Sequence, residues 1–264
     1  MPLAPPRSLS PSKVSAFTTC PLAFRFTTID RLPEPPSPHA LKGTLVHTAL
    51  EGLIWNHVAG QRTPEAASAE LAAAWVGLAD DPEFRALGLS PGEAEAFLAD
   101  AEQLVRNYFL LEDPDDVHAI GVELGLEFAL GNTRLRGIID RLDVNGDGDL
   151  VVIDYKTGRA PSARFEHGRL SGVHLYALLC EQVLGRTPVE VRLLHLRDPV
   201  TITATPNSQS VSGQRRRASA VWTAIERACE REDFQPRPSG LCRSCHFQSL
   251  CPAFGVHAPE PTTS

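Results

Sequence analysis

The stretch that decides the fold runs from residue 137 to residue 158 and reads Gly-Ile-Ile-Asp-Arg-Leu-Asp-Val-Asn-Gly-Asp-Gly-Asp-Leu-Val-Val-Ile-Asp-Tyr-Lys-Thr-Gly. One apolar run ends at Asp140, a polar turn follows, and a second apolar run leads to Asp154, Tyr155 and Lys156. Because successive side chains of a strand point to opposite faces, Asp154 and Lys156 share a face. A carboxylate on one strand, beside a carboxylate and an amine on the next, suits a hard cation that activates water near a phosphate. The stretch therefore predicts a hydrolase.

The polar turn between the two runs has two interpretations. Asp143, Asn145 and Asp147 match the start of a calcium-binding helix-loop-helix signature, with Asp154 in the closing position. That signature requires flanking helices and a closing glutamate, whereas here both flanks are apolar, β-branched runs. Asn145-Gly146-Asp147-Gly148 is typical of a hairpin turn instead, and we favour the hairpin.

Outside this stretch, the hydrophobic periodicity of the chain predicts a small mixed sheet between helices. The first three strands are expected to form an antiparallel meander. The expected strands are 117–130, 135–144, 150–155, 189–196 and 200–204, and the expected helices are 10–17, one from Gly43, 64–111 with an interruption near 88–92, 170–184 and 208–231. A proline-rich connector is expected at 32–39 and a loop at 158–168. Residues 9–255 are predicted to form one domain with a helical insertion at about 60–112, between disordered tails at 1–8 and 256–264.

The composition is that of a soluble globular protein. The 264 residues carry a formal net charge of −7, with 42% hydrophobic and 22% charged residues. This charge does not exclude nucleic-acid binding, because phosphates respond to charges within a Debye length. No apolar run approaches the roughly 20 residues that cross a bilayer, and the N-terminus lacks a signal-peptide core. The expected location is cytoplasmic, without a membrane.

Six cysteines fall into two groups. Cys180 and Cys229 stand alone within helical patterns and are expected to be buried apolar side chains. The segment Cys242-Arg-Ser-Cys245-His-Phe-Gln-Ser-Leu-Cys251 has metal-binding spacing. It fits structural zinc, with His246 or a distant cysteine as the fourth ligand, or an iron-sulfur cluster completed by a cysteine from elsewhere. Cys20 is the obvious distant partner in either case.

The two halves of the opening stretch, 137–143 and 152–158, resemble the nuclease core of the PD-(D/E)XK superfamily. They are most similar to its RecB-type exonuclease branch, which includes the CRISPR adaptation nucleases. The resemblance covers the chain from Cys20 to Cys251. It implies an α/β, restriction-endonuclease-like core with a mixed sheet flanked by helices. It also implies a metal-dependent DNA exonuclease of repair, recombination or defence that acts on ends or single strands.

The resemblance also implies a metal site. Asp140 and Asp154 would hold Mg²⁺ or Mn²⁺, since hard oxygen ligands select hard ions. Residues 43–47, Gly-Thr-Leu-Val-His, match the Gly-x-x-x-His helix of the branch, so His47 becomes a metal ligand. The carbonyl of Tyr155 would complete the set of ligands.

Further roles follow from the same resemblance. Lys156 would orient or deprotonate the attacking water and offset charge on the phosphorane. Glu123 matches a position that is often acidic, and its alternative is an exposed strand glutamate. Tyr176 matches a tyrosine that follows a glutamine by four residues in the family. Here Gly172 stands at the glutamine position, which puts substrate positioning in doubt, and His174 is a nearby polar side chain.

The cysteines match the family as well. One N-terminal and three C-terminal cysteines bind a four-iron four-sulfur (4Fe-4S) cluster there, and Cys20, Cys242, Cys245 and Cys251 match these positions. The implied cluster would be a structural clasp that joins the two termini. Structural Zn²⁺ remains the alternative occupant.

Three questions stay open at this point. Arg215, Arg216 and Arg217 form either a solvated helical face or a contact to the phosphate backbone. The chain has no phosphate-binding loop of the helicase type, so any helicase would be a separate partner. The rival functions are a catalytically weak or inactive DNA-binding subunit of a helicase-nuclease complex, for which Gly172 argues, and a zinc-stabilised interaction protein.

Overall fold

The computed structural model describes residues 3–160 and 163–255, without the side chains of 163–173. The chain divides into two compact units. Unit 1 contains Met1–Pro35, Ala129–Leu135 and Arg216–Ser264, and unit 2 contains Pro36–Phe128 and Arg136–Arg215. The predicted catalytic residues all belong to unit 2, and the cysteines of the predicted clasp belong to unit 1.

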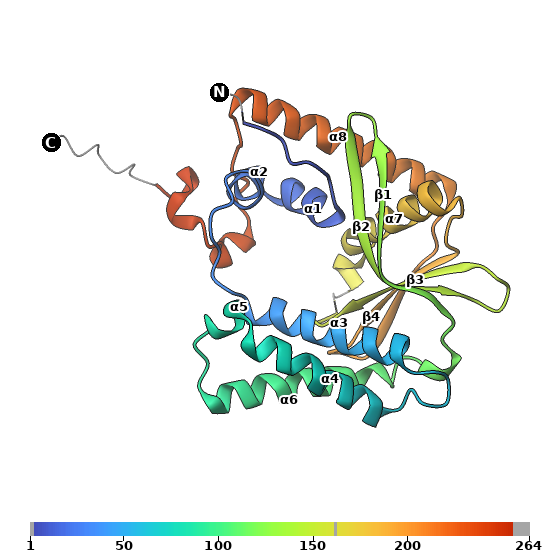
Figure 1. Ribbon diagram of the computed structural model, residues 1–264. Helices are drawn as coiled ribbons and strands as arrows, with labels where there is room; N and C mark the ends of the chain where they lie inside the picture. Colours follow the sequence, from blue (N-terminus) through green and yellow to red (C-terminus); the bar gives the residue numbers. More distant parts are fainter. Residues whose placement is uncertain (1–2, 161–162, 256–264) are drawn as a thin grey trace. The chain divides into compact units, whose positions relative to one another are not determined.

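A five-stranded sheet has the order β1-β2-β3-β4-β5 (Figure 1). The strands are β1 (Ala119–Leu130), β2 (Thr133–Val144), β3 (Leu150–Lys156), β4 (Glu190–His195) and β5 (Val200–Ala204). β3 pairs antiparallel with β2 and parallel with β4, and β4 pairs antiparallel with β5, so the sheet is mixed. The predicted α/β fold with a mixed sheet flanked by helices is confirmed, and each strand lies within two residues of its expected bounds.

The turn between β2 and β3 is a hairpin, as predicted. Asn145 Oδ1 accepts hydrogen bonds from the backbone N–H of Asp147 (3.1 Å) and of Asp149 (2.8 Å). Gly148 has a φ of +83°, a conformation that glycine adopts without strain. The side-chain oxygen of Asn145 thus organises the turn, and strands rather than helices flank it.

The parallel pair β3–β4 requires a crossover connection, and α7 (Ala163–Leu184) provides it. The predicted loop at 158–168 is therefore too long, since α7 begins at Ala163. On β2, a Cβ at Gly137 would lie 2.6 Å from Cδ1 of Leu179 on α7. Gly137 thus permits a close approach between α7 and the strand that carries Asp140.

The first helix of unit 2, α3 (Pro38–Asn56), starts five residues before the expected Gly43. Ser37 accepts a hydrogen bond from the N–H of Ala40 (3.3 Å), and Pro38 occupies the first helical position. The connector predicted at 32–39 was wrong at its end, because this proline begins a helix instead of interrupting one.

The core of unit 2 packs α3 against other helices and one face of the sheet. The helices are α4 (Pro64–Asp80), α5 (Pro82–Arg85) and α6 (Pro91–Tyr108), followed by the 3-10 turn Pro114–Asp116. Ser90 and Glu93 form a capping box at the start of α6. Side chains of α3, α4 and α6 share one apolar cluster with Val151, Ile153 and Tyr155 of β3. The helical segment expected at 64–111 is confirmed.

Unit 1 contains the two ends of the chain. Its N-terminal part holds α1 (Pro11–Thr19), α2 (Pro21–Phe24) and the π-helical turn Arg25–Ile29. Ser10 caps α1 as expected, with Pro11 at the first position. Its C-terminal part holds most of α8 (Ser208–Arg231) and the 3-10 turns Gly240–Ser244, Gln248–Leu250 and Pro252–Phe254.

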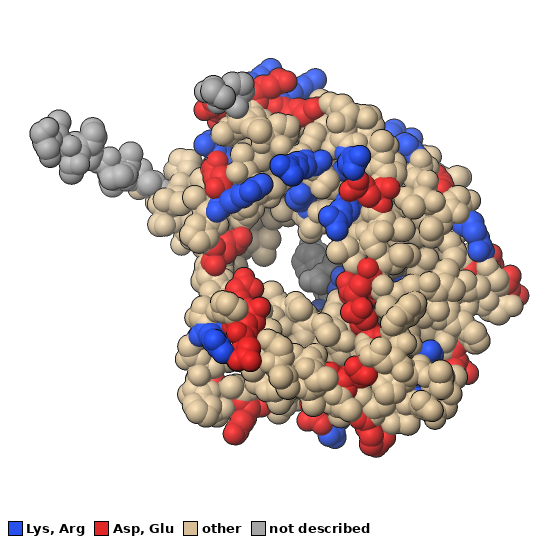
Figure 2. Space-filling model, in the orientation of Figure 1, with Lys and Arg blue, Asp and Glu red and all other residues tan. Residues whose placement is uncertain are grey.

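Disordered tails were expected at residues 1–8 and 256–264, and the structure describes only residues 3–8 of these. Leu3 donates its backbone N–H to the carbonyl of Cys229 (3.2 Å), and residues 256–264 lie outside the described range. No helix in the part of the chain that the structure describes is long and apolar enough to cross a bilayer. Figure 2 shows Lys and Arg side chains beside Asp and Glu side chains at several places on the face drawn, and the formal net charge of the chain is −7.

Candidate active site

The ends of β2 and β3 bring the predicted carboxylates together. Arg141 pairs with Ile153, so continuing the antiparallel register by one residue places Asp140 opposite Asp154. Asp140 Oδ2 accepts a hydrogen bond from the backbone N–H of Tyr155 (2.7 Å). Asp154 Oδ2 lies 2.5 Å from Nζ of Lys156, as expected for side chains on one face. Asp154 is buried, whereas its ion-pair partner Lys156 is partly exposed.

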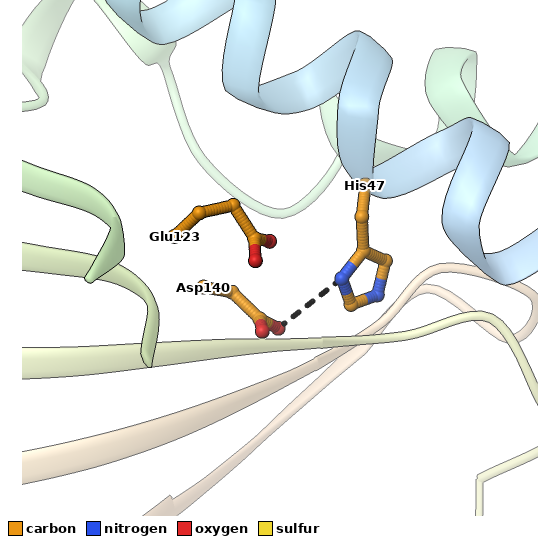
Figure 3. Close-up of side chains that lie close together, drawn as sticks. All are labelled: His47, Glu123 and Asp140. Atoms are coloured by element: carbon orange, nitrogen blue, oxygen red, sulfur yellow. Dashed lines mark ion pairs between the residues drawn. The ribbon is translucent and has the colours of Figure 1, made fainter. Parts of the chain in front are cut away.

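A candidate metal centre lies beside this pair. His47 from α3, Glu123 from β1 and Asp140 from β2 offer ligand atoms that all lie within 4.8 Å of one another (Figure 3). His47 Nδ1 is 3.6 Å from Asp140 Oδ2. One imidazole nitrogen and two carboxylates suit a divalent cation. Asp154 is outside this group of three, with one oxygen paired to Lys156.

The tautomer of His47 follows from its hydrogen bond. Nε2 lies 3.2 Å from the carbonyl oxygen of Tyr155, which can only accept, so Nε2 donates. In the neutral ring, Nδ1 then carries the lone pair and faces Asp140. Burial, the largest effect, lowers the pKa of His47, which keeps the ring neutral at pH 7. The histidine is thus oriented as a ligand; the role of the Tyr155 carbonyl as a second ligand stays a prediction.

The carboxylates of this centre repel one another in the metal-free protein. Burial, and then the charge of Asp154, raise the pKa of Asp140 to about 7, although the Tyr155 N–H and Lys156 oppose the shift. Burial and the charge of Asp140 also raise the pKa of Glu123. A divalent cation would relieve this repulsion, so the residues present fit the predicted metal.

The backbone of Glu123 is in an unusual conformation. Its φ is +43°, in the left-handed region that non-glycine residues seldom adopt and that costs about 1–3 kcal/mol. The regular alternation of β1 changes there, because Gly121 and Leu126 are both buried although they are five positions apart and a regular strand would place them on opposite faces. The sequence predicted a regular strand through Glu123. The irregular backbone instead delivers its carboxylate to the metal centre.

Helix α7 contributes the predicted tyrosine. Burial, followed by the charges of Asp154, Asp140 and Glu123, raises the pKa of Tyr176, so its hydroxyl stays protonated near the carboxylates. His174 is half-buried, and its Nδ1 has no hydrogen-bond partner among the described residues. Gly172 falls in the part of α7 without described side chains. Substitution of the family glutamine by His174 therefore stays a prediction.

A buried arginine network was not foreseen. Arg141 binds two carboxylates, with Nε 2.9 Å from Asp143 Oδ1 and Nη2 3.0 Å from Glu112 Oε2. Its Nη1 donates to the hydroxyls of Tyr155 (2.9 Å) and Tyr108 (3.1 Å). The network anchors the side chain of Tyr155, whose backbone contacts two residues of the metal centre. The i, i+2 spacing of Arg141 and Asp143 on one strand face was the available signal.

The four predicted cysteines of unit 1 line one pocket, together with apolar side chains such as Phe26 and Phe247. The four, Cys20, Cys242, Cys245 and Cys251, are free and half-buried. His246 is exposed and does not line the pocket.

Among the described residues, the cysteines do not form a group of three potential ligands within 4.8 Å of one another. The identity of the group that the four thiols bind stays a prediction. Cys180 and Cys229 are buried away from this pocket, as expected, and burial raises the pKa of Cys180 to about 12.

The predicted arginines follow one another on α8. The guanidinium of Arg215 lies over the ring of Phe128 at 5.7 Å from its centroid. Arg216 and Arg217 are exposed. A phosphate contact by these residues stays a prediction.

Comparisons with known proteins indicate a nuclease family. The family model described as "PD-(D/E)XK nuclease superfamily" matches residues 8–252. The Gene 69 protein of Mycobacterium phage L5 is 25% identical over 96% of this chain and 98% of its own length. One subunit of the ATP-dependent helicase/deoxyribonuclease of Streptococcus pyogenes serotype M3 is 28% identical over 60% of this chain, and the match covers 15% of that larger protein.

A solved structure shares the fold. The crystal structure of a Eubacterium rectale protein, whose description provisionally assigns it as an exonuclease, has a TM-score of 0.56 and 12% identity. The alignment covers 90% of this chain and 87% of that one. At this identity the likeness shows the fold alone.

Proposed function

We propose that this chain, which belongs to the PD-(D/E)XK nuclease superfamily, is a metal-dependent DNA exonuclease of the RecB-type branch. The observation that carries the proposal is the placement of the His47, Glu123 and Asp140 group beside the Asp154–Lys156 pair in unit 2. The Gly43-to-His47 motif on α3 supports the assignment to the branch. The reaction is hydrolysis of a phosphodiester bond in DNA.

The chain's own residues would divide the work as follows. Asp140, Glu123 and His47 hold Mg²⁺ or Mn²⁺, with Asp154 on the neighbouring strand. When bound, the ion polarises the phosphate oxygens and lowers the pKa of water. Lys156 is kept in place by Asp154 Oδ2 at 2.5 Å and is partly exposed, so its ammonium can reach substrate.

The bonds that form and break during hydrolysis determine the role that each side chain would have. The oxygen of water forms a bond to phosphorus, the bond to the leaving oxygen breaks, and that oxygen takes up a proton. Lys156 places the water and offsets the negative charge that develops on the phosphate. Tyr176, protonated and close to the carboxylates, is available to position the substrate phosphate.

We further propose that Cys20, Cys242, Cys245 and Cys251 bind a 4Fe-4S cluster with a structural role. The shared pocket and the free thiols support a metal-binding site, and the match of these four positions to the family's cysteines favours the cluster over zinc. The cluster would fasten the N-terminal and C-terminal segments of unit 1 to each other, and hydrolysis itself needs no electron transfer.

The proposed substrate is DNA with an end or a single-stranded region. The similarity to a helicase/deoxyribonuclease component supports a separate helicase as partner and a role in repair, recombination or defence. Arg215, Arg216 and Arg217 are proposed phosphate contacts. The rival function, an inactive DNA-binding subunit, is disfavoured because Asp140, Asp154 and Lys156 are all in place.

The proposal is tested by degradation of linear and covalently closed circular DNA with Mn²⁺, under anaerobic conditions with the cysteine site loaded. We expect the wild type to degrade labelled linear DNA and to spare circles, and Lys156→Met to lose most of this activity. Arg85→Ala, which removes one exposed charge from α5, is the control and should stay active. Equal activity of wild type and Lys156→Met would overturn the proposal, and cleavage of circles would replace exonuclease by endonuclease.

A further inference from the structure

A pocket that is distinct from the cysteine pocket lies in unit 2, beside the residues that follow Lys156 in the chain. It has a volume of about 470 Å³ and is lined by Thr157, Gly158 and Arg159, which follow β3 in the chain. Other segments complete the lining, with His39 and Lys42 from α3, Asp100 from α6 and Arg197 from the residues after β4. Three permanent cations thus face one carboxylate.

The cations of this pocket are arranged around Asp100. Its Oδ2 lies 2.5 Å from Nζ of Lys42 and 2.7 Å from Nη2 of Arg197. Burial favours the neutral acid, but the hydrogen bonds from these two cations outweigh it and lower the pKa of Asp100. Asp100 is therefore ionised and keeps Lys42 and Arg197 in fixed positions. Arg159 is exposed and has no ion-pair partner among the described residues.

The pocket lies near the candidate active site along α3. Lys42 precedes His47 by five residues, a rise of about 7.5 Å along a helix. A Cβ at Gly43 would lie 3.4 Å from Thr157 Oγ1, so α3 runs close to the chain just after Lys156. The pocket therefore lies about one and a half helical turns from His47 along α3, beside the chain that follows Lys156.

We propose that this pocket binds a phosphate group of the substrate strand that neighbours the scissile phosphate, with Arg159, Lys42 and Arg197 as its contacts. The inference rests on the proposed nuclease function and extends it. An anionic phosphate offsets the excess of two positive charges, partly as a phosphodiester with one negative charge and more fully as a terminal phosphate, and the guanidinium donors match phosphate oxygens. The group is either an internal phosphodiester or a terminal phosphate, which share this chemistry.

Binding of an internally labelled single-stranded oligonucleotide to the full-length, cluster-loaded protein in EDTA tests the proposal, with fluorescence anisotropy as the readout. Arg159→Ala should weaken binding by about 5- to 10-fold and reduce the salt slope of log K by about 1, as expected for one lost phosphate contact. Asp100→Asn should tighten binding, because it frees two cations. Arg85→Ala removes another exposed arginine, outside the pocket, and should leave both quantities unchanged.

Two further comparisons separate the outcomes. If the group is terminal, the wild type prefers oligonucleotides with a 5′- or 3′-phosphate over hydroxyl ends, and Arg159→Ala abolishes that preference. If it is internal, Arg159→Ala weakens all oligonucleotides equally. Should Arg159→Ala match Arg85→Ala in affinity and salt slope, the pocket assignment fails even if the protein degrades DNA. A wild type without nuclease activity whose binding still depends on Arg159 keeps the pocket and overturns the nuclease proposal.

Discussion

At the scale of single residues, His47 is the side chain whose setting says most about the site. Its Nε2 is held by the Tyr155 carbonyl at 3.2 Å, which leaves Nδ1 directed toward Asp140. The same residue, Tyr155, donates its N–H to Asp140 at 2.7 Å. A single peptide segment of β3 thus orients two candidate ligands, and its own side chain is fixed by Arg141.

The raised pKa of Asp140 predicts how stability depends on pH in the metal-free protein. Its folded pKa of about 7 lies above the ordinary aspartate value of 3.8, so the folded state binds more protons between these values. Stability therefore falls as pH rises from 4 to 7, by at most about 4 kcal/mol. Urea unfolding from pH 4 to 8 should show this decline in the wild type and a smaller one in Asp140→Asn. Asp147→Asn, in the exposed turn, should behave like the wild type, and an unchanged slope in Asp140→Asn would contradict the assignment.

Because the backbone of Glu123 is strained, we predict that replacing this residue raises the stability of the protein and lowers its nuclease activity. Glu123→Gly removes an unfavourable φ and a repelling charge, so the metal-free protein should gain about 1–2 kcal/mol of unfolding free energy while DNA degradation falls. Glu127→Gly, on the same strand, should instead lose about 0.5–1 kcal/mol. Thermal unfolding and nuclease assays of both variants check this. A destabilised Glu123→Gly would mean that its backbone is not strained.

At the scale of elements, the strands were predictable because alternation and turn chemistry are local. The fifth strand, at 200–204, matches its expected bounds. The start of α3 was misplaced because Pro38 was taken as part of a connector. Asp140, Asp154 and Lys156 were found because they end apolar runs, whereas the φ of Glu123 and the pairing of Arg141 with Glu112 depend on tertiary contacts that no local pattern records.

The contact between β2 and α7 can be tested at Gly137. Gly137→Ala should destabilise the protein by about 1–3 kcal/mol, because its Cβ would come 2.6 Å from Leu179 Cδ1. Leu179→Ala removes the clashing methyl group but destabilises the core by itself. The double variant should therefore lose less unfolding free energy than the sum of the losses of the two single variants. Additive losses in urea unfolding would show that the contact does not limit the packing.

At the scale of the whole molecule, the candidate active site and the proposed clasp belong to different units. The candidate metal centre, Lys156 and the pocket lined by Arg159 belong to unit 2, and the cysteine pocket belongs to unit 1. The spacing of the three C-terminal cysteines predicted a metal-binding site from the sequence, but this spacing alone fits both zinc and iron-sulfur. The single domain expected over residues 9–255 stays a prediction.

The clasp predicts a specific dependence on Cys20. Protein purified without oxygen should contain about four irons and absorb visible light, and Cys20→Ser should lose most of the iron and unfold at a lower temperature. Cys229→Ala, in unit 1 but outside the pocket, should keep the iron. Metal analysis and absorbance spectra decide the matter. Zinc in place of iron, or full iron in Cys20→Ser, would contradict the proposed cluster.

The central claim is that Asp140 holds the cation that hydrolysis requires, and one comparison of rates tests it most directly. The Mn²⁺-dependent rate of degradation of end-labelled linear DNA is measured for the wild type, Asp140→Asn and Asp147→Asn, all cluster-loaded. We predict a loss of about 10³-fold or more for Asp140→Asn, equivalent to several kcal/mol of transition-state stabilisation, and no loss for Asp147→Asn. Wild-type rates in Asp140→Asn, or equal losses in both variants, would contradict the claim.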